Sequence, residues 1–447
     1  MTSRRHVLFH VQHLLGIGHV QRAAAIATAM AERDDLEVTV LSGGEKVPGI
    51  AFGEARVVEL PSARAADASF KTLLDARGAP LDEAFHARRR DLALDAFRRA
   101  APDLLLIESF PFGRRAFRQE LDALIDAAGA RGVPVLCSLR DIVVAKPDPA
   151  RRRAIVERVR ADFARVLVHG DPALLPLDAS FPEAGEITDR LVYTGYVVAP
   201  PVGVERENPA SRRFPPPRPS PPRGEGEDEA ALRPTPSPLA GEGRGGGDFA
   251  PAAEDGRPGA GEVLVSAGGG AVGEALLRTA LVARELTRST AAARRWRLIA
   301  GPNLPQPAFD ALAASLPKDG SIALDRFRAD FRERLRHCAV SISQAGYNTV
   351  LDILDAGARA VLVPFAAGAE TEQTLRAELL AARGRAAVVL EATLSPATLA
   401  ASVDAALAEP RHQAAVSVDR NGAARTAAIV AAIAAEPRGH GAASLPD

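Results

Sequence analysis

Short apolar runs alternate with longer amphipathic stretches over the first 200 residues of the chain. Strand-like runs occur at 6–11, 36–44, 55–60, 103–109, 132–141, 164–171 and 190–196. Helical patterns lie between them, for example from His19 to Arg33 and from Leu81 to Ala100. Strands that alternate with helices in this way predict a parallel sheet covered by helices on both faces.

The alternation stops near Pro200 and resumes with the run "GEVLVS" after position 260. Further strand-like runs occur at 295–301, 321–327, 338–346, 359–365 and 386–391, and the alanine-rich segment 422–435 is helical in pattern. Two α/β domains are therefore predicted, at 1–200 and 262–436, with a flexible tail at 437–447. The pattern leaves open whether the last helix crosses back to the first domain. Ligands bind such sheets at the carboxyl ends of their strands, so the site is expected in a cleft between the two facing domains.

The segment at 201–261 is rich in Pro, Gly and charged residues and contains two near-copies, "PSPPRGEGE" (219–227) and "PSPLAGEGR" (236–244). Such a composition cannot bury a core, so we predict a disordered insert in the linker between the domains. A Pro-rich docking segment for a partner is the alternative.

Composition excludes several classes of protein. The 447 residues carry a net charge of −1, which argues against a nucleic-acid partner. The two cysteines, Cys137 and Cys338, each adjoin a strand-like run and are expected to be buried thiols, not a disulfide framework or a metal site. Histidines interrupt the apolar start of the chain, and no window has the roughly 18 apolar residues of a membrane span. A cytoplasmic location is expected, with contact at a membrane surface left open.

The stretch "HLLGIGHVQRAA" joins the first predicted strand to the first predicted helix. Gly16 and Gly18 permit a tight turn and a close approach of the backbone to a ligand. The helix start favours anions and a neutral imidazole, so His19 is a candidate general base. The alternative is an ordinary polar residue at a helix start. Gln21 stands where a dinucleotide-binding fingerprint needs its third glycine.

Two segments of the second half place polar or glycine-rich turns after strands. Gly268, Gly269 and Gly270 follow the first strand there, and their N–H groups are candidates for cradling a diphosphate, a flexible turn being the alternative. In "SQAGYNTVLD", Gly346 turns the chain and Asn348 and Thr349 are expected to cap the next helix.

Three further polar residues of the second half are candidates for ligand contacts. Asp352 is placed to accept ribose hydroxyls, or is simply an acid that a helix N-terminus favours. Glu372 and Gln373, with Glu370, follow the run "LVPF" at a strand end, where they face a ligand or form a solvated loop.

These segments, together with "ESFPFGR" (108–114), "YTGYV" (193–197) and the block "SQAGYNTVLD…VPF…EQTLRA", resemble the B-type glycosyltransferases of family 28. The chain resembles more closely a bacterial group of predicted glycosyltransferases. The resemblance spans nearly all of both α/β domains and omits the insert. It implies two Rossmann-like domains, with a nucleotide-sugar donor in the second and the acceptor in the first.

The resemblance also implies roles for donor-side residues. Asp352 falls where the family has a ribose-binding Glu and is one methylene shorter, and Gln373 matches one of two paired glutamines, the other being Glu372 here. Gly346 and Thr349 match the phosphate-facing helix start. Gly268–Gly270 replaces the Gly-Gly-Ser-type loop of the family. Phe327 falls in the loop that, in the family, contacts the base of the nucleotide through backbone atoms. His19 matches the family's histidine near the acceptor.

Glu108 and Asp141 are rivals or helpers of His19, because each ends an apolar strand of the first sheet. Either is a candidate base or orients His19. Either is also explained as a helix cap or as a partner of Arg114 or Arg140. No Asp-x-Asp pair occurs in the chain, so helix N-termini and not a metal ion are expected to stabilise a departing diphosphate.

The sequence therefore predicts a metal-independent, inverting glycosyltransferase without a cofactor. It would move a hexosyl group from a nucleotide-diphosphate sugar, expected to be a uridine one, to an unknown lipid-linked or small acceptor. A nucleotide-sugar hydrolase remains an alternative, because "GIGHVQR" fits the Gly-x-Gly-His-x-x-Arg loop of related hydrolases. A sugar-nucleotide epimerase on the same fold is a second alternative. A non-catalytic nucleotide-sugar-binding protein is a third, and it would keep Asp352 and the phosphate-binding loops but would not need His19.

Overall fold

A computed structural model describes residues 4–14, 18–66, 72–144, 148–198, 256–268, 272–289, 295–366, 371–409 and 418–437. The insert predicted at 201–261 lies outside these residues up to position 255, and the predicted tail lies outside them from position 438. The described residues belong to one compact unit.

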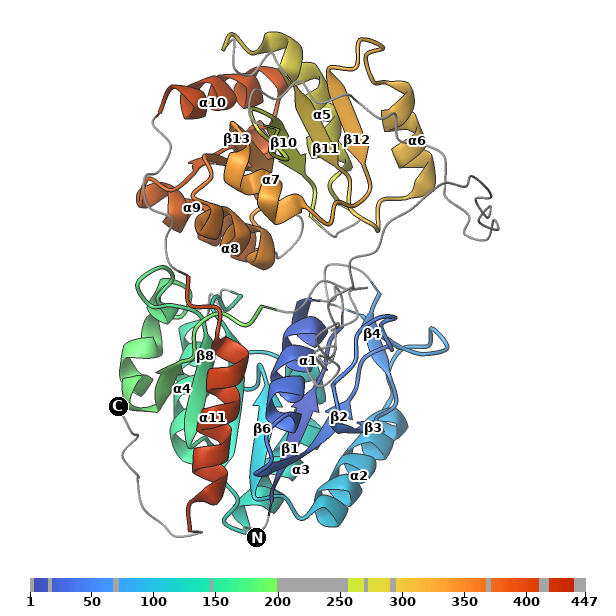
Figure 1. The fold of residues 1–447 in the computed structure, drawn as a ribbon. Coiled ribbons are helices and arrows are strands. Elements are labelled where there is room, and N and C mark those ends of the chain that lie inside the picture. Colours follow the sequence, from blue (N-terminus) through green and yellow to red (C-terminus); the bar gives the residue numbers. More distant parts are fainter. Residues whose placement is uncertain are drawn as a thin grey trace, which may run out of the picture. The chain divides into compact units, whose positions relative to one another are not determined.

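The first domain is built on a seven-stranded sheet in which every strand is parallel to its neighbours (Figure 1). Its order is β3 (Arg56–Glu59), β2 (Leu36–Ser42), β1 (Arg5–Val11), β6 (Leu104–Glu108), β7 (Val135–Arg140), β8 (Arg165–His169) and β9 (Leu191–Tyr193). All seven strands coincide with the runs predicted from the sequence. The chain order reverses between β1 and β6, which pair with Val7 opposite Leu104.

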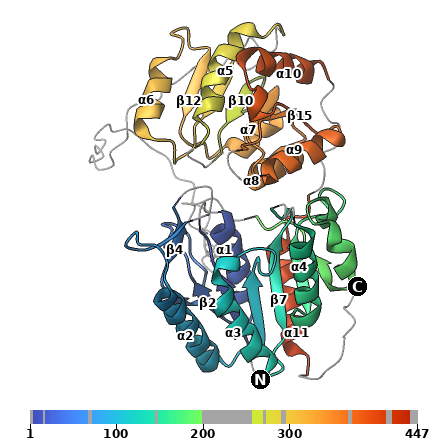
Figure 2. The same ribbon diagram turned by 180° about the vertical axis from the view of Figure 1, so that it is seen from behind.

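Alternate residues of the central strands face two different layers of helices. Leu8, Leu105 and Ile107 pack toward α2 (Glu83–Ala100), α3 (Arg118–Gly129) and α4 (Pro149–Asp162), which Figure 2 shows from their side. Phe9 and Leu106 pack on the other side, toward α1 (Gly18–Ala31) and α11 (Gly422–Ala435). Because β1 and β6 are buried on both faces, their sequences are continuous apolar runs.

The last helix belongs to the first domain and not to the segment 262–436 in which the sequence analysis placed it. Val430 is fully buried in the same core as Val7 of β1, and α11 lies along α1. The motif "YTGYV" is hydrogen-bonded to the segment that leads into α11: Tyr196 N donates to Asp419 O at 2.7 Å, and Gly422 N donates to Tyr196 O at 3.1 Å. The apolar face of a helix predicts that the helix is buried, but it does not predict which sheet the helix packs against.

The second domain is a six-stranded parallel sheet. Its order is β12 (Ile322–Asp325), β11 (Trp296–Ile299), β10 (Val263–Ser266), β13 (Val340–Ser343), β14 (Ala360–Leu362) and β15 (Ala387–Val388). Helices α5 (Glu274–Leu286), α6 (Gln306–Ala314) and α10 (Pro396–Ala408) pack on one face, and α7 (Phe331–His337), α8 (Tyr347–Ala356) and α9 (Glu372–Ala382) on the other. None of the helices in the described ranges is long and apolar enough to cross a bilayer.

One pair of strands was not predicted from the sequence. β4 (Ala63–Ala65) and β5 (Leu73–Asp75) form a small antiparallel pair beside the first sheet. Each strand has three residues, which is too short to show the two-residue alternation that identifies a strand.

The order of strands in each sheet fixes where ligands are expected to bind. In open α/β sheets the ligand lies beyond the carboxyl ends of the strands, where the strand order reverses. In the first sheet that point is between β1 and β6, and in the second between β10 and β13. The ends of these four strands and the chain that follows them contain His19, Glu108, Gly268 and Gly346.

Candidate functional site

His19 and Glu108 meet at the reversal point of the first sheet. His19 is the second residue of α1, and Glu108 is the last residue of β6. The Nδ1 atom of His19 lies 2.6 Å from Oε1 of Glu108, with the carboxylate buried and 22% of the histidine side chain exposed. Of the three carboxylate and imidazole groups proposed from the sequence, these are the two that the structure brings together.

Glu108 accepts hydrogen bonds from four side chains through its two oxygens. On Oε1 it accepts from His19, from Ser109 Oγ at 2.8 Å and from Arg22 Nη2 at 3.1 Å. On Oε2 it accepts from Nε and Nη2 of Arg114 at 3.2 and 2.9 Å. Arg22 Nη2 also lies 3.1 Å from His19 Nδ1. These hydrogen bonds fix the position of the Glu108 carboxylate, although glutamate side chains are usually flexible.

This environment sets the protonation of both groups. Burial raises the pKa of Glu108, but the positive charge of Arg114 and the contacts with His19 and Arg22 outweigh burial and hold that pKa well below its ordinary value. Burial, aided by the charges of Arg114 and Arg22 and opposed by Glu108, lowers the pKa of His19 to about 3. At neutral pH the glutamate is ionised and the imidazole is neutral. A neutral ring that donates from Nδ1 has an unprotonated Nε2.

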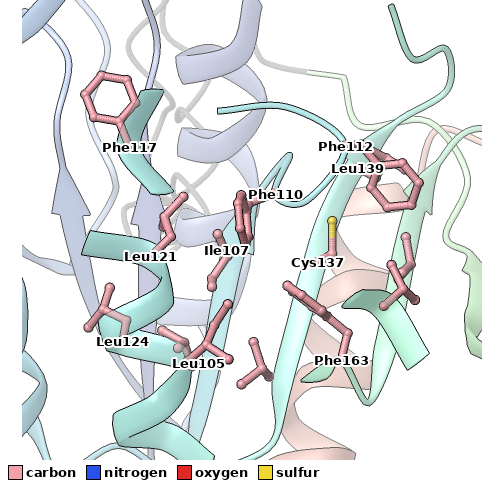
Figure 3. Packing of buried hydrophobic residues seen from close by; sticks show 14 of the residues in the cluster. Leu105, Ile107, Phe110, Phe112, Phe117, Leu121, Leu124, Cys137, Leu139 and Phe163 are labelled. Atoms are coloured by element: carbon pink, nitrogen blue, oxygen red, sulfur yellow. The ribbon is translucent and has the colours of Figure 1, made fainter. Parts of the chain in front are cut away.

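The segment "SFPFGR" after Glu108 is anchored in the core of the first domain. Phe110 and Phe112 are buried, and Figure 3 shows them beside Cys137 and Leu139 of β7. The backbone on either side has a left-handed conformation at two residues other than glycine, Ser109 (φ 65°) and Arg114 (φ 61°). Such conformations are uncommon for residues with a side chain and concentrate at functional sites. Both residues donate to Glu108.

Asp141 has a different set of contacts. It is fully buried after β7, where its carboxylate accepts from Nη2 of Arg376 at 3.1 and 3.2 Å and from the Ile142 N–H at 3.0 Å. Arg376, from α9, also donates to Ala345 O at 3.0 Å. The partner of Asp141 is thus an arginine that lies 235 positions away and is neither Arg140 nor His19. These contacts explain the burial of Asp141 without a role in catalysis.

Part of the glycine turn at the reversal point of the second sheet is described. Gly268 has a φ of +67°, which favours glycine, and Gly269, Gly270 and the acceptor-side Gly16 lie outside the described residues. Gly18 is exposed at the start of α1. The sequence analysis missed Gly273, which precedes α5 and where a Cβ would lie 2.0 Å from the Cβ of Ala267. The turn into α5 therefore requires a glycine at that position.

The helix that follows β13 begins earlier than the sequence analysis expected. Gly346 is its N-cap and makes no side-chain cap, so the prediction that Asn348 and Thr349 cap the helix is wrong. Both residues lie inside the first turn, Asn348 exposed and Thr349 half-buried. The preference of Asn and Thr for capping yielded to the glycine turn, since Gly346 enters the helix from an extended conformation (φ −64°, ψ 147°). Without a side-chain cap, the first N–H groups of α8 are open to a ligand.

Asp352 lies between two arginines. Its Oδ1 atom is 3.0 Å from Nε of Arg332 and 3.2 Å from Nη1 of Arg420. Arg420 also donates to Leu351 O at 2.7 Å, so it is held by the same helix. Burial raises the pKa of Asp352, against the opposing effect of both arginines. Its Oδ1 is shared by the two cations.

The remaining donor-side residues are not in a strand-end loop as the sequence analysis expected: Glu372 and Gln373 form the start of α9, and Glu370 lies outside the described residues. Glu372 is buried at the start of α9 and forms an ion pair with Arg140. Gln373 accepts a hydrogen bond from the Phe365 N–H at 3.2 Å, and Phe327, after β12, is 61% exposed. Within the described ranges, no group of three His, Cys, Asp or Glu side chains is arranged to hold a metal ion.

Comparisons with known proteins find a family match in the second half of the chain. Residues 269–430 match the glycosyltransferase family 28 C-terminal domain. The chain is 34% identical over 102 residues to the UDP-N-acetylglucosamine--N-acetylmuramyl-(pentapeptide) pyrophosphoryl-undecaprenol N-acetylglucosamine transferase of Agrobacterium fabrum, covering 23% of this chain and 27% of that relative. It is 37% identical over 110 residues to the enzyme of the same name from Brucella canis, covering 24% and 29%. The chain thus matches less than a third of the length of these curated relatives.

Solved structures that are similar over nearly the full length of the chain show its fold. MurG of Acinetobacter baumannii has a TM-score of 0.55 at 15% identity, covering 95% of this chain and 99% of that one. The glycosyltransferase of kitacinnamycin has a TM-score of 0.56 at 16% identity, covering 96% and 99%. The chain therefore has the two-domain fold of the B-type glycosyltransferases, as predicted. The resemblance to family 28 is confirmed, and it is carried by the C-terminal domain.

Proposed function

We propose that this protein is an inverting, metal-independent glycosyltransferase that moves a hexosyl group from a nucleotide-diphosphate sugar to an acceptor hydroxyl. The observation that carries the proposal is the pair of His19 and Glu108, 2.6 Å apart at the reversal point of the first sheet. The family 28 domain at 269–430 supports a nucleotide sugar as the donor, and the UDP-sugar in the names of the curated relatives favours a uridine nucleotide.

The proposed reaction is a direct displacement at the anomeric carbon. The acceptor oxygen forms a bond to that carbon, while the bond between the carbon and the diphosphate oxygen breaks and its electron pair leaves with the diphosphate. The acceptor proton passes to the unprotonated Nε2 of His19, and Glu108 stabilises the imidazolium through Nδ1. A single displacement from the side opposite the leaving group inverts the configuration at the anomeric carbon.

The departing diphosphate needs positive potential in place of a metal ion. The start of α8, which has no side-chain cap after Gly346, offers N–H groups and the positive end of a helix dipole. The left-handed Gly268 turns the chain after β10 beside it, since β10 and β13 are paired neighbours. The absence of an Asp-x-Asp pair from the sequence is consistent with this arrangement.

Thermal unfolding in the presence of nucleotides tests the donor site. With EDTA present, we expect UDP or a UDP-sugar to raise the unfolding temperature, because a ligand at a hundred times its Kd stabilises by about 2.7 kcal/mol. Asp352→Ala should abolish the shift. Asp355→Ala is the matched control, because Asp355 lies on the same helix and also contacts Arg420, at 3.6 Å. If no nucleotide raises the unfolding temperature, the proposed donor is wrong.

Hydrolysis is the second candidate, favoured by one observation. The arginine of the Gly-x-Gly-His-x-x-Arg pattern, Arg22, is buried and contacts both His19 and Glu108. The same base would then activate water. Release of sugar from the donor at the same rate with and without any acceptor would favour hydrolysis over transfer.

A further inference from the structure

The backbone around Glu108 is organised to present donors to one carboxylate. Ser109 and Arg114 have the left-handed conformations described above, and the buried Phe110 and Phe112 fix the chain between them. The Phe112 ring packs edge-on against the Phe181 ring, with 5.2 Å between the ring centroids, so Phe112 cannot shift without disturbing the core. Gly113 N donates to Ser109 O at 2.7 Å and closes the turn. Strained backbone of this kind persists only where its surroundings fix it.

The two arginines of the cluster act on different atoms. Arg114 places both Nε and Nη2 on Oε2 of Glu108, so its fork determines the orientation of the carboxylate plane. Arg22 uses a single nitrogen, which lies 3.1 Å from both Oε1 and His19 Nδ1. Because Arg22 approaches the oxygen that His19 also uses, it does not select which oxygen faces the imidazole.

We propose that Arg114 is a positioning residue: its two-point contact with Oε2 turns Oε1 of Glu108 toward His19, holds the imidazole in the tautomer protonated at Nδ1, and leaves Nε2 free. Its part in transfer rests on the proposed function, whereas its effect on the ring of His19 does not. The charge of Arg114 has a second effect, because it disfavours protonation of His19.

Other titratable groups surround this pair and are the same in every variant considered below. Arg22 interacts electrostatically with Arg140, Asp141 and Tyr347. Glu108 interacts electrostatically with His13, Cys137 and His169. Among the hydrogen bonds of the described residues, none of these groups donates to Oε2 of Glu108, which accepts only from Nε and Nη2 of Arg114. The orientation of the carboxylate therefore depends on Arg114 in a way that it does not depend on its neighbours.

A titration of the full-length protein labelled with ¹⁵N-histidine tests the proposal without substrate. The resonances of His19 are those lost in His19→Gln. In the wild type, the ring nitrogens should report a neutral ring with hydrogen on Nδ1 down to the lowest pH at which the protein stays folded. In Arg114→Gln, the affinity of His19 for a proton should rise at least tenfold, and the tautomer protonated at Nε2 should become visible.

Arg115→Gln is the matched control, because it removes the same charge from the next residue, whose side chain is exposed and makes no hydrogen bond or ion pair among those of the described residues. Its His19 resonances should follow the wild type. Identical titrations of Arg114→Gln and Arg115→Gln would overturn the proposal.

Arg114→Lys separates charge from geometry and carries the test if Arg114→Gln does not fold. Lysine retains the charge but not the fork, so we expect His19 to remain neutral while its two tautomers mix. A wild-type tautomer in Arg114→Lys would show that the two-point contact does not position Glu108. Because none of these measurements uses a donor or acceptor, failure of the transfer reaction would leave the result on Arg114 intact, and the reverse also holds.

Discussion

Glu108 has positive charge on both sides, from Arg22 and Arg114, and a neutral imidazole as its third partner. The cluster therefore has an excess of positive charge, which keeps His19 unprotonated and ready to accept a proton. The same charge makes the imidazolium costly. An anionic donor bound nearby would offset this cost, because the effect of unlike charges in a buried site is large. The strength of the base would thus depend on whether a donor is bound.

Glu108→Gln and Asp141→Asn distinguish the two candidate carboxylates. The first substitution keeps the shape of the side chain but removes the charge that stabilises the imidazolium, so we expect the rate of donor-sugar consumption to fall by about 10² to 10⁴. Asp141→Asn breaks a buried ion pair with Arg376 and should lower stability by about 3 to 5 kcal/mol. Rates from folded protein, with unfolding temperatures measured in parallel, provide the check. A larger catalytic loss in folded Asp141→Asn than in Glu108→Gln would contradict our assignment.

At the scale of elements, a buried network joins β1 to the helices behind the first sheet. Glu120 of α3 accepts from Nε and Nη2 of Arg89 of α2, each at 2.6 Å, and its Oε1 lies 2.9 Å from Nε2 of His10 of β1. Arg89 also donates to Gln12 Oε1 at 2.8 Å and to Gly43 O at 3.1 Å. The network thereby fixes the end of β1, from which the chain continues toward His19.

This network should make the first domain sensitive to acid. Burial raises the pKa of Glu120, but the hydrogen bonds from Arg89 and His10 outweigh burial and lower it to about 2. A pKa below that of the unfolded chain means that the carboxylate stabilises the fold above about pH 4.5 and loses that effect as the pH falls toward 2. The contribution is about 3 kcal/mol. Glu120→Gln should therefore be less stable at neutral pH and show a flatter dependence of unfolding free energy between about pH 4.5 and 2.

Denaturant unfolding across that pH range measures the effect. The control is Glu83→Gln, which removes an exposed carboxylate from the first turn of α2 and should keep the wild-type slope. Equal slopes for the wild type and Glu120→Gln would show that the network does not govern acid stability.

The elements were more predictable than their pairings. The ends of β6 and β7, and with them Glu108 and Asp141, follow from apolar runs that are buried on both faces. The sequence could not decide which carboxylate meets His19, because that depends on β1 lying beside β6. The partner of Asp141 is 235 positions away, and no local pattern extends so far. The exact start of α8 was missed because a glycine turn took precedence over the capping preference of Asn348.

At the scale of the whole molecule, the first domain is assembled from two distant parts of the chain. Ala427, Val430 and Ala434 of α11 are buried against the sheet that residues 5–193 build. The stability of the first domain should therefore respond to substitutions near position 430. Ala427→Asp would bury a carboxylate with no partner and should cost several kcal/mol. Ala428→Asp places the same group at the next, exposed position of the same helix and should leave the unfolding temperature nearly unchanged.

Calorimetry of the two variants checks this, with limited proteolysis to identify which domain opens. We expect cleavage of Ala427→Asp within the first 200 residues. Cleavage confined to the second domain would contradict the packing of α11 described here.

The return of α11 has a consequence for synthesis on the ribosome. The strands of the first sheet are complete at Tyr193, but α11, which covers one face of the sheet together with α1, begins at Gly422, more than two hundred residues later. At translation rates of roughly 5 to 20 residues per second, that face waits on the order of ten seconds or longer for its helix. Meanwhile the second domain emerges whole and can fold first, so a nascent chain of this protein presents the apolar part of the sheet that α11 covers to chaperones until α11 appears.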